Sequence, residues 1–166
     1  MMTRQSLRAE HIALLVGAGG TCLFLGALGF QYIGGYPPCE MCMWQRYPHF
    51  GAIVAGLGGG LLLQAGILPQ ALARPLAILA ALLLAITGVI GVYHAGVEWQ
   101  MWAGPRACTG TAFQITGKLD LNAHVVSCDH AAWRLFGVSM AGYNALISLG
   151  FAIAGFALLM RKGKSA

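Results

Sequence analysis

The stretch Leu76-Ala-Ile-Leu-Ala-Ala-Leu-Leu-Leu-Ala-Ile-Thr-Gly-Val-Ile-Gly-Val-Tyr93 contains no charged residue. A helix of roughly 20 such residues crosses the ~30 Å hydrocarbon core of a bilayer. Three further stretches have the same character, at about Ile12–Phe30, Phe50–Leu68 and Ala141–Met160. The stretches are continuous rather than alternating, which favours helices over a barrel. The sequence therefore predicts an all-α membrane protein, a four-transmembrane-helix bundle that forms a single domain over residues 1–166.

The composition supports a lipid environment. The chain is 58% hydrophobic and only 9% charged, whereas a soluble domain is about 25% charged. The net charge of +5 does not indicate nucleic acid, because many of the basic residues flank the apolar stretches. No small-x-small cleavage site follows the first stretch, so it is predicted to be a span and not a signal peptide.

Basic residues in the connections predict the orientation of the spans. One side, with both termini and the connection near Pro69, carries six Lys or Arg residues and one acid; the other carries four basic residues and four acids. The positive-inside rule places the first side in the cytoplasm and turns segments 31–49 and 94–140 outward. The second outward loop is long, and its aromatic residues predict that it lies on the membrane interface. The basic residues compared are Arg4, Arg8, Arg74, Arg161, Lys162 and Lys164 against Arg46, Arg106, Lys118 and Arg134.

Four of the five cysteines fall in the outward loops. Cys39 and Cys42 form a C-x-x-C pair in the first loop, and Cys108 and Cys128 stand apart in the second. Cys22 lies in the first span and is interpreted as a small apolar filler. An even set of thiols on one face is typical of disulfides, and a C-x-x-C pair is typical of redox-active ones.

Other uses of these cysteines fit the spacing less well. Haem c attachment requires C-x-x-C-H, but position 43 is Met. A four-thiolate zinc site usually has two C-x-x-C pairs, and only one is present. A structural disulfide remains open for Cys108 and Cys128. For Cys42, the start of the second helix and the charge of Arg46 favour the reactive thiolate, while Glu40 opposes it.

The stretch Cys39-Glu-Met-Cys-Met-Trp-Gln-Arg46 resembles the C-x-x-C-x-x-x-R signature of the bacterial disulfide-bond formation protein B (DsbB) family. The segment from Cys128 to Met140 resembles the family's approach to its fourth helix, and Cys108 falls where the family has its other loop cysteine. The resemblance implies a multi-pass protein of the bacterial inner membrane, with both termini cytoplasmic and the active cysteines periplasmic.

The resemblance also implies a mechanism. A reduced DsbA-like thioredoxin-fold partner attacks the Cys108–Cys128 disulfide through Cys108, and the released Cys128 engages Cys39. Cys42 is left as a thiolate beside a quinone from the membrane pool, ubiquinone or menaquinone, with Arg46 stabilising the charge on its ring. The family places a His near the outer end of the third helix. His94 is close to that place, and a polar cap at the helix end is the alternative reading.

Two other functions were weighed against this one. A reductase that passes electrons outward would need a cytoplasmic cysteine, and the sequence has none. A membrane scaffold or small transporter with structural disulfides would be expected to carry charges within its spans, and the predicted spans contain essentially none.

Overall fold

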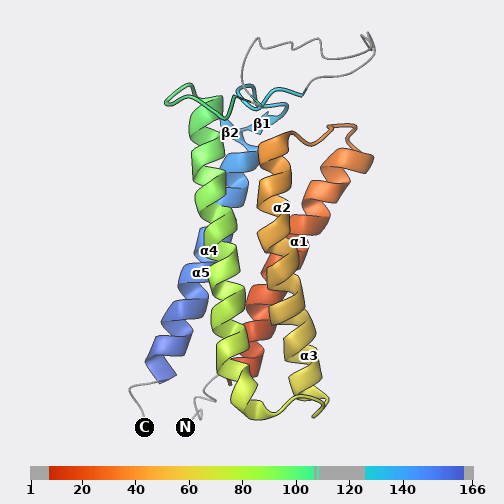
Figure 1. The fold of residues 1–166 in the computed structure, drawn as a ribbon, viewed down its shortest axis with the longest axis vertical. Coiled ribbons are helices and arrows are strands. Elements are labelled where there is room, and N and C mark those ends of the chain that lie inside the picture. The colour runs from red at the N-terminus through yellow and green to blue at the C-terminus, as the bar shows by residue number, and fades with distance from the viewer. Residues whose placement is uncertain (1–7, 107, 109–125, 163–166) are drawn as a thin grey trace.

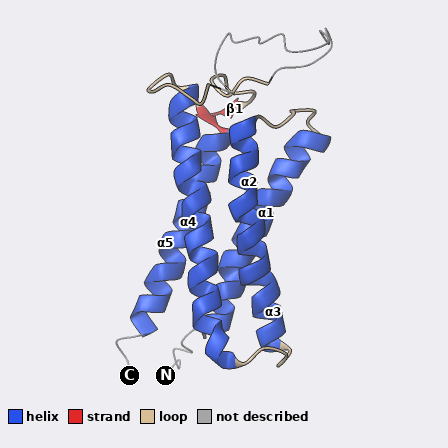
Figure 2. Ribbon diagram, in the orientation of Figure 1, coloured by secondary structure: helices blue, strands red, loops and turns tan. Residues whose placement is uncertain are grey.

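The computed structural model describes residues 8–106, 108 and 126–162, apart from the side chain of Lys162. Its long helices run side by side as a bundle (Figures 1 and 2). They are α1 (Ala9–Tyr32), α2 (Glu40–Ala52), the π-helical η1 (Ile53–Gly58), α3 (Gly59–Gln64), the short η2 (Gln70–Leu72), α4 (Ala73–Glu98) and α5 (Met140–Lys162). The start of α1, the α3–α4 connection and the end of α5 share one end of the bundle (Figure 1). The loops that carry the four cysteines lie at the other end.

Three helices are long and apolar enough to cross a membrane, namely Ala9–Tyr32, Gln70–Glu98 and Met140–Arg161. They confirm the first, third and fourth predicted spans. The second span, at 50–68, stays a prediction, and the helical segment in that part of the chain begins at Glu40 and ends at Gln64.

The early start of α2 has a local cause. Cys39 is extended and caps the helix, with its sulfur accepting a hydrogen bond from the backbone N–H of Cys42 at 3.1 Å. The polar residues of the next two turns do not meet lipid, since Gln45 and His49 are buried in the bundle. Because Gln45 and His49 are polar, hydropathy places the start of the span after them. Their hydrogen-bond partners, however, lie inside the bundle.

Small residues let the helices approach closely. A β-carbon on Gly56 would stand 2.8 Å from both the Gly17 Cα and the Ala13 backbone oxygen, so α1 and η1 are in backbone contact there. Gly60 meets the Leu14 side chain in the same way. The small-xxx-small spacing of Gly56 and Gly60 thus serves helix packing. The core between α1, α4 and α5 is built around buried Val16, Ala81 and Leu84.

A short antiparallel hairpin interrupts the otherwise helical fold before α5. β1 (Arg134–Leu135) pairs with β2 (Val138–Ser139). Phe136 and Gly137 between them both have positive φ, at 49° and 81°, as a tight two-residue hairpin turn requires. The all-α prediction missed this hairpin because strands of two residues leave no alternating pattern.

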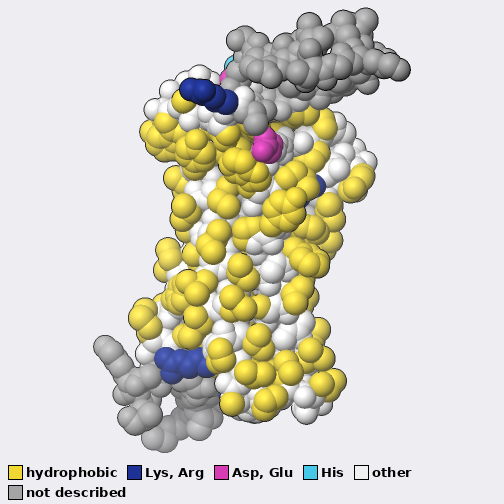
Figure 3. Space-filling model, viewed as in Figure 1, with side chains coloured by type: hydrophobic (Ala, Val, Ile, Leu, Met, Phe, Trp, Pro, Cys, Tyr) yellow, Lys and Arg dark blue, Asp and Glu magenta, His cyan; other side chains and the backbone are white. Residues whose placement is uncertain are grey.

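The surface fits the predicted lipid environment. On the face shown in Figure 3, hydrophobic side chains cover the middle of the bundle, and most visible charged side chains lie toward its ends. Arg4, Lys118 and Lys164, which entered the charge comparison, lie outside the described residues, as does most of the second outward loop. The sidedness of the chain and the interfacial position of that loop therefore stay predictions.

Candidate active site

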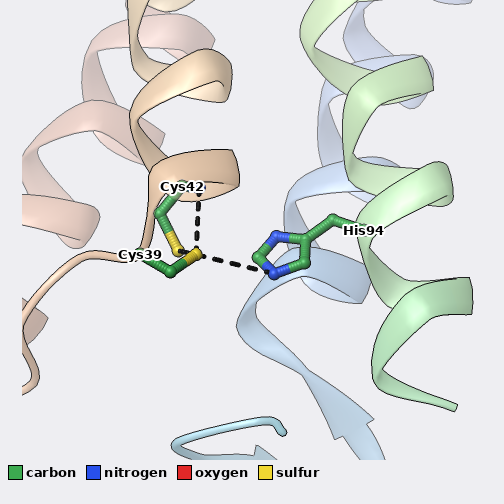
Figure 4. A group of neighbouring side chains, drawn as sticks. All are labelled: Cys39, Cys42 and His94. Atoms are coloured by element: carbon green, nitrogen blue, oxygen red, sulfur yellow. Dashed lines mark hydrogen bonds between the residues drawn. The ribbon is translucent and has the colours of Figure 1, made fainter. Parts of the chain in front are cut away.

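The C-x-x-C pair occupies the first turn of α2. Cys39 is buried and Cys42 half-buried, and their sulfurs lie 2.6 Å apart (Figure 4). A disulfide has an S–S distance of about 2.05 Å, so a small movement separates this free pair from a closed one. The helix N-terminus directs its partial positive charge at these sulfurs. This geometry allows a disulfide to form between Cys39 and Cys42, and the redox-active role of the pair stays a prediction.

The other two loop cysteines form a disulfide, Cys108–Cys128, with their Cα atoms 5.4 Å apart. The Cys39 sulfur lies within 4.8 Å of both sulfurs of this bond. Cys128 is fully buried, while Cys108 is 9% exposed. Met41 and Val97 pack around the cysteines and keep the cluster largely free of water. A third sulfur is thus placed next to an existing disulfide, as thiol–disulfide exchange requires.

His94 approaches the pair from α4, on the opposite side of the site (Figure 4). Its Nε2 atom lies 3.7 Å from the Cys39 sulfur and 3.7 Å from Glu98 Oε1. The ring is 3% exposed, and it also interacts with the backbone of Cys128. His94 is therefore part of the cysteine cluster in this structure and not only a cap at the end of the helix.

A buried chain of hydrogen bonds extends from His94 into the bundle. The Gln45 amide nitrogen donates to His94 Nδ1 at 2.9 Å, and the Gln45 amide oxygen accepts from the Asn144 amide nitrogen at 2.7 Å. His49 Nε2 donates to the Asn144 amide oxygen at 2.8 Å. Thr87 donates to the backbone oxygen of Gln45 at 3.0 Å. Three helices are thus joined through polar groups in a region that hydropathy treats as apolar.

Arg46 lies between α1 and α2. Its guanidinium donates to the Gln31 side-chain oxygen at 2.5 Å and to the Ala27 backbone oxygen at 3.3 Å. Arg46 and Cys42 are one turn apart on α2, as the sequence predicted, and both line the same cavity. The charge is half-buried and held in place by α1, so it is more than a freely solvated anchor at the membrane surface.

This cavity has a volume of about 370 Å³ and lies against the four long helical segments. Much of its wall is apolar and includes Leu23, Phe30, Trp133 and Ile147. Its polar groups include Arg46, His94 and Glu98, and both Cys39 and Cys42 reach it. Cys22, interpreted from the sequence as a filler, is exposed on α1 and also lines the cavity. The result is an apolar pocket with a reactive polar end, the usual form of a small-molecule site.

The two thiols of the C-x-x-C pair differ in acidity. The hydrogen bond from Cys39 lowers the pKa of the Cys42 thiol, and the Arg46 charge adds to this effect. Donating that hydrogen bond, together with burial, raises the pKa of Cys39 far above its usual value. Cys42 is therefore the stronger acid of the pair, and Cys39 is the weaker.

Metal binding fits the cysteines less well. Cys39, Cys42 and His94 have ligand atoms within 4.8 Å of one another, and so do Cys39, Cys108 and Cys128. Among the described residues, Cys42 does not join the second group, and two of that group's sulfurs are bonded to each other. The four cysteines therefore do not form the four-thiolate cluster of a structural zinc site.

Sequence reasoning missed Gln45, Glu98 and Asn144, all of which contact or approach the site. A signal for two of them was present. Asn144 lies within a predicted span, and Gln45 lies just before one. A polar side chain at membrane depth needs a partner inside the bundle, which marks such residues as candidates.

A buried C-x-x-C pair beside a second cysteine pair, at one end of a bundle of membrane-spanning helices, defines a transmembrane thiol–disulfide protein. The chain belongs to the family described as disulfide bond formation protein DsbB, whose model matches residues 9–158. It is thus a transmembrane oxidoreductase that acts in disulfide-bond formation.

Individual relatives agree with this assignment. Disulfide bond formation protein B of Shewanella sp. (strain MR-4) is 27% identical over 150 residues, which cover 85% of this chain and 81% of the relative. The uncharacterized protein RP370 of Rickettsia prowazekii (strain Madrid E) is 24% identical over 126 residues, which cover 72% of this chain and 69% of that protein. No solved structure matches the chain significantly.

Proposed function

We propose that the protein oxidises the dithiol of a periplasmic, DsbA-like thioredoxin-fold partner and passes the electrons to a membrane quinone, ubiquinone or menaquinone. One observation carries the proposal. The Cys39 sulfur lies within 4.8 Å of both sulfurs of the Cys108–Cys128 disulfide, while its neighbour Cys42 lines the apolar cavity. The four cysteines thus form a continuous path from the outer loop to a site for a lipid-soluble ligand.

The first steps need only sulfur chemistry. A thiolate of the partner attacks the more exposed Cys108, and a mixed disulfide forms as Cys128 leaves as a thiolate. Cys128 then attacks Cys39 of a closed Cys39–Cys42 pair, and Cys42 leaves as a thiolate. The second thiol of the partner displaces Cys108 and completes the partner's disulfide. The Cys108 thiolate then attacks Cys128, which re-forms the Cys108–Cys128 disulfide and leaves Cys39 and Cys42 reduced. Each step exchanges one S–S bond for another and needs no external oxidant.

The cavity fits a quinone ring. Its apolar wall suits the ring faces and an isoprenoid tail, and its polar end offers Arg46 and His94 to the ring oxygens. When bound, a quinone accepts two electrons and two protons and is released as a quinol. The Cys42 thiolate stands at the cavity wall, ready to give up its electrons. The Arg46 guanidinium, held by Gln31 and Ala27, would stabilise negative charge on a ring oxygen.

The same arrangement supports the proposed placement in the membrane. The described ends of the chain share one end of the bundle, and the four cysteines lie at the other (Figure 1). With the basic flanks in the cytoplasm, the cysteines face the periplasm of the inner membrane, where a thioredoxin-fold partner can reach Cys108.

Purified protein tests this function directly. It is mixed with a reduced DsbA-like protein and a short-chain quinone, and partner thiols and quinone absorbance are followed together. One quinone should be consumed for each partner disulfide formed, and Cys42→Ser should stop both. Partner oxidation without quinone consumption, or reduction of an oxidised partner by quinol as the favoured direction, would contradict the proposal.

A further inference from the structure

Glu98 is a buried carboxylate for which the cysteine relay provides no role. It stands in the last turn of α4, is 8% exposed and lines the cavity. Its Oε1 atom lies 3.7 Å from His94 Nε2, and its Oε2 atom has no hydrogen-bond partner among the described residues. The C-terminal end of a helix carries partial negative charge, so a permanent carboxylate is unfavourable in this place. A carboxylate kept there at such a cost suggests a use in the chemistry.

The chemistry needs a proton acceptor beside Cys39. When the reduced Cys39–Cys42 pair closes, two electrons and two protons must leave it. Cys42 is the stronger acid of the pair and gives up its proton first, because the hydrogen bond from Cys39 lowers its pKa. Cys39 keeps its proton, because that same bond and burial raise its pKa. The Cys39 sulfur can enter the new S–S bond only as its proton passes to a base.

His94 is the nearest ring to Cys39, but its hydrogen bonds prevent it from taking this proton. The Gln45 amide nitrogen faces both the Met41 backbone oxygen, at 3.1 Å, and His94 Nδ1, at 2.9 Å. The Gln45 amide oxygen accepts from Asn144, so the amide orientation is set on both sides. His94 Nδ1 must therefore be an acceptor, and Nε2 already carries the hydrogen. A second proton on the ring would have to be on Nδ1, where it would point at the Gln45 N–H.

We infer that Glu98 accepts the Cys39 proton when the Cys39–Cys42 disulfide forms, and that Gln45 is a positioning residue that holds His94 as a neutral donor between them. The inference rests on the proposed redox cycling of this pair. His94 Nε2 is 3.7 Å from the Cys39 sulfur and 3.7 Å from Glu98 Oε1. The Cys39 sulfur and Glu98 Oε1 are therefore at most twice that distance apart. A chain of one or two waters in the cavity spans such a gap.

The step balances in atoms and electrons. In net terms, Cys39–SH and the Cys42 thiolate lose two electrons to the acceptor and one proton to the Glu98 carboxylate, and one S–S bond forms. The protonated Glu98 lies at the cavity wall, where it can return that proton to the reduced acceptor. The charged and titratable groups around Glu98 are His94 on its own helix, Cys39, Cys42 and Arg46 on α2, Arg134 on β1, and His130 at the cavity wall.

The test uses quinone-free, detergent-solubilised full-length protein and oxidised glutathione. The Cys42 thiolate first captures the small disulfide, and Cys39 then displaces glutathione to close the pair. Acid-quenched samples analysed by mass spectrometry give the two rate constants as a function of pH. Glu98→Gln should slow closure by on the order of 10²-fold, the usual contribution of a positioned base, without slowing capture. It should also remove the rise in the closure rate that follows Glu98 ionisation.

Two variants serve as controls. Glu98→Asp should recover part of the closure rate, whereas Glu40→Gln, which removes an exposed carboxylate from the same tetrapeptide, should leave the closure rate and its pH profile unchanged. Closure by Glu98→Gln at the wild-type rate and with the wild-type pH profile would overturn the inference. Capture by Cys42 is measured in the same sample, so a misfolded variant is recognised by the loss of both capture and closure. If Glu98→Gln misfolds, the pH profile of closure by Glu98→Asp decides whether Glu98 is the base. Failure of the wild-type protein to oxidise a partner with quinone would instead count against the proposed function.

Discussion

The Arg46 guanidinium is bound to the Gln31 side-chain oxygen at 2.5 Å, which ties the first turns of α2 to the end of α1. The charge therefore stays at the cavity wall beside Cys42 instead of extending into the headgroup region. The planar guanidinium bonds α1 through both of its terminal nitrogens, an arrangement that a lysine ammonium would not reproduce.

Replacement of Arg46 should affect quinone chemistry. Arg46→Lys keeps the charge but loses the planar fork, so the apparent KM for quinone should rise with a smaller loss in kcat. Arg46→Ala should reduce activity by on the order of 10²-fold, as for the loss of a group that stabilises developing negative charge. Steady-state kinetics with a quinone series, normalised to folded protein, gives both values, and Gln31→Leu controls for the lost contact with α1. Unaltered kcat and KM in Arg46→Ala would remove Arg46 from the site.

The two cysteine pairs should be separable. Cys108→Ser or Cys128→Ser should block oxidation of the protein partner, because the first disulfide of the relay is gone. Cys39 and Cys42 should still reduce quinone when a small dithiol replaces the partner. Cys42→Ser should stop quinone reduction in both assays. If Cys108→Ser oxidised the partner at the normal rate, the order of the relay would be wrong.

Thiol labelling should report the orientation of the chain. In intact cells treated with a reductant, a membrane-impermeant maleimide should reach the half-buried Cys42 and Cys108, which is the more exposed cysteine of its pair, since the positive-inside rule turns their loops outward. A cysteine introduced at Arg74, in the opposite connection, should be labelled only after the membrane is disrupted. Labelling of the native cysteines only in disrupted cells would mean that the orientation is reversed.

The thiols of Cys39 and Cys42 should titrate in different pH ranges. Only the thiolate is alkylated, so the lowered pKa of Cys42 keeps it reactive as the pH falls below the usual thiol range. The raised pKa of Cys39 keeps it unreactive as the pH rises through that range. Alkylation rates of the reduced protein, followed by mass spectrometry against pH, show both. In Cys39→Ser the titration of Cys42 should move upward, and a joint titration at the usual thiol value would refute this assignment.

The contact between α1 and η1 should be sensitive to a single methyl group. In Gly56→Ala the new carbon would stand 2.8 Å from the Gly17 Cα and the Ala13 backbone oxygen, which can yield only if a helix shifts. Overpacking of this kind destabilises a protein by about 1–3 kcal/mol. Gly150→Ala is the matched control, because nothing lies within 4 Å of its added carbon. Thermal unfolding in detergent compares the two, and equal stabilities would show that this contact is not tight in solution.

The sequence predicted the parts of the molecule that depend on local composition. Apolar runs located α1, α4 and α5 to within a few residues, and cysteine spacing located the reactive pair. The predicted second span starts ten residues after the start of α2, because hydropathy does not register that Gln45 and His49 find polar partners inside the bundle. The contacts of His94 with Cys39 and of Glu98 with His94 depend on how α4 is rotated against α2. No local sequence pattern predicts that rotation.

The wall of the cavity includes side chains that also belong to the outer surface of the bundle. Cys22 on α1 is exposed, and Ile147 on α5 is 39% exposed, yet both line the cavity. A ligand dissolved in the bilayer can therefore enter sideways and never needs to cross water. The concentration that governs its binding is then its mole fraction in the lipid. An apparent KM expressed per litre of buffer should rise as more detergent or lipid is added to the same amount of quinone, while the value expressed per mole of lipid stays constant.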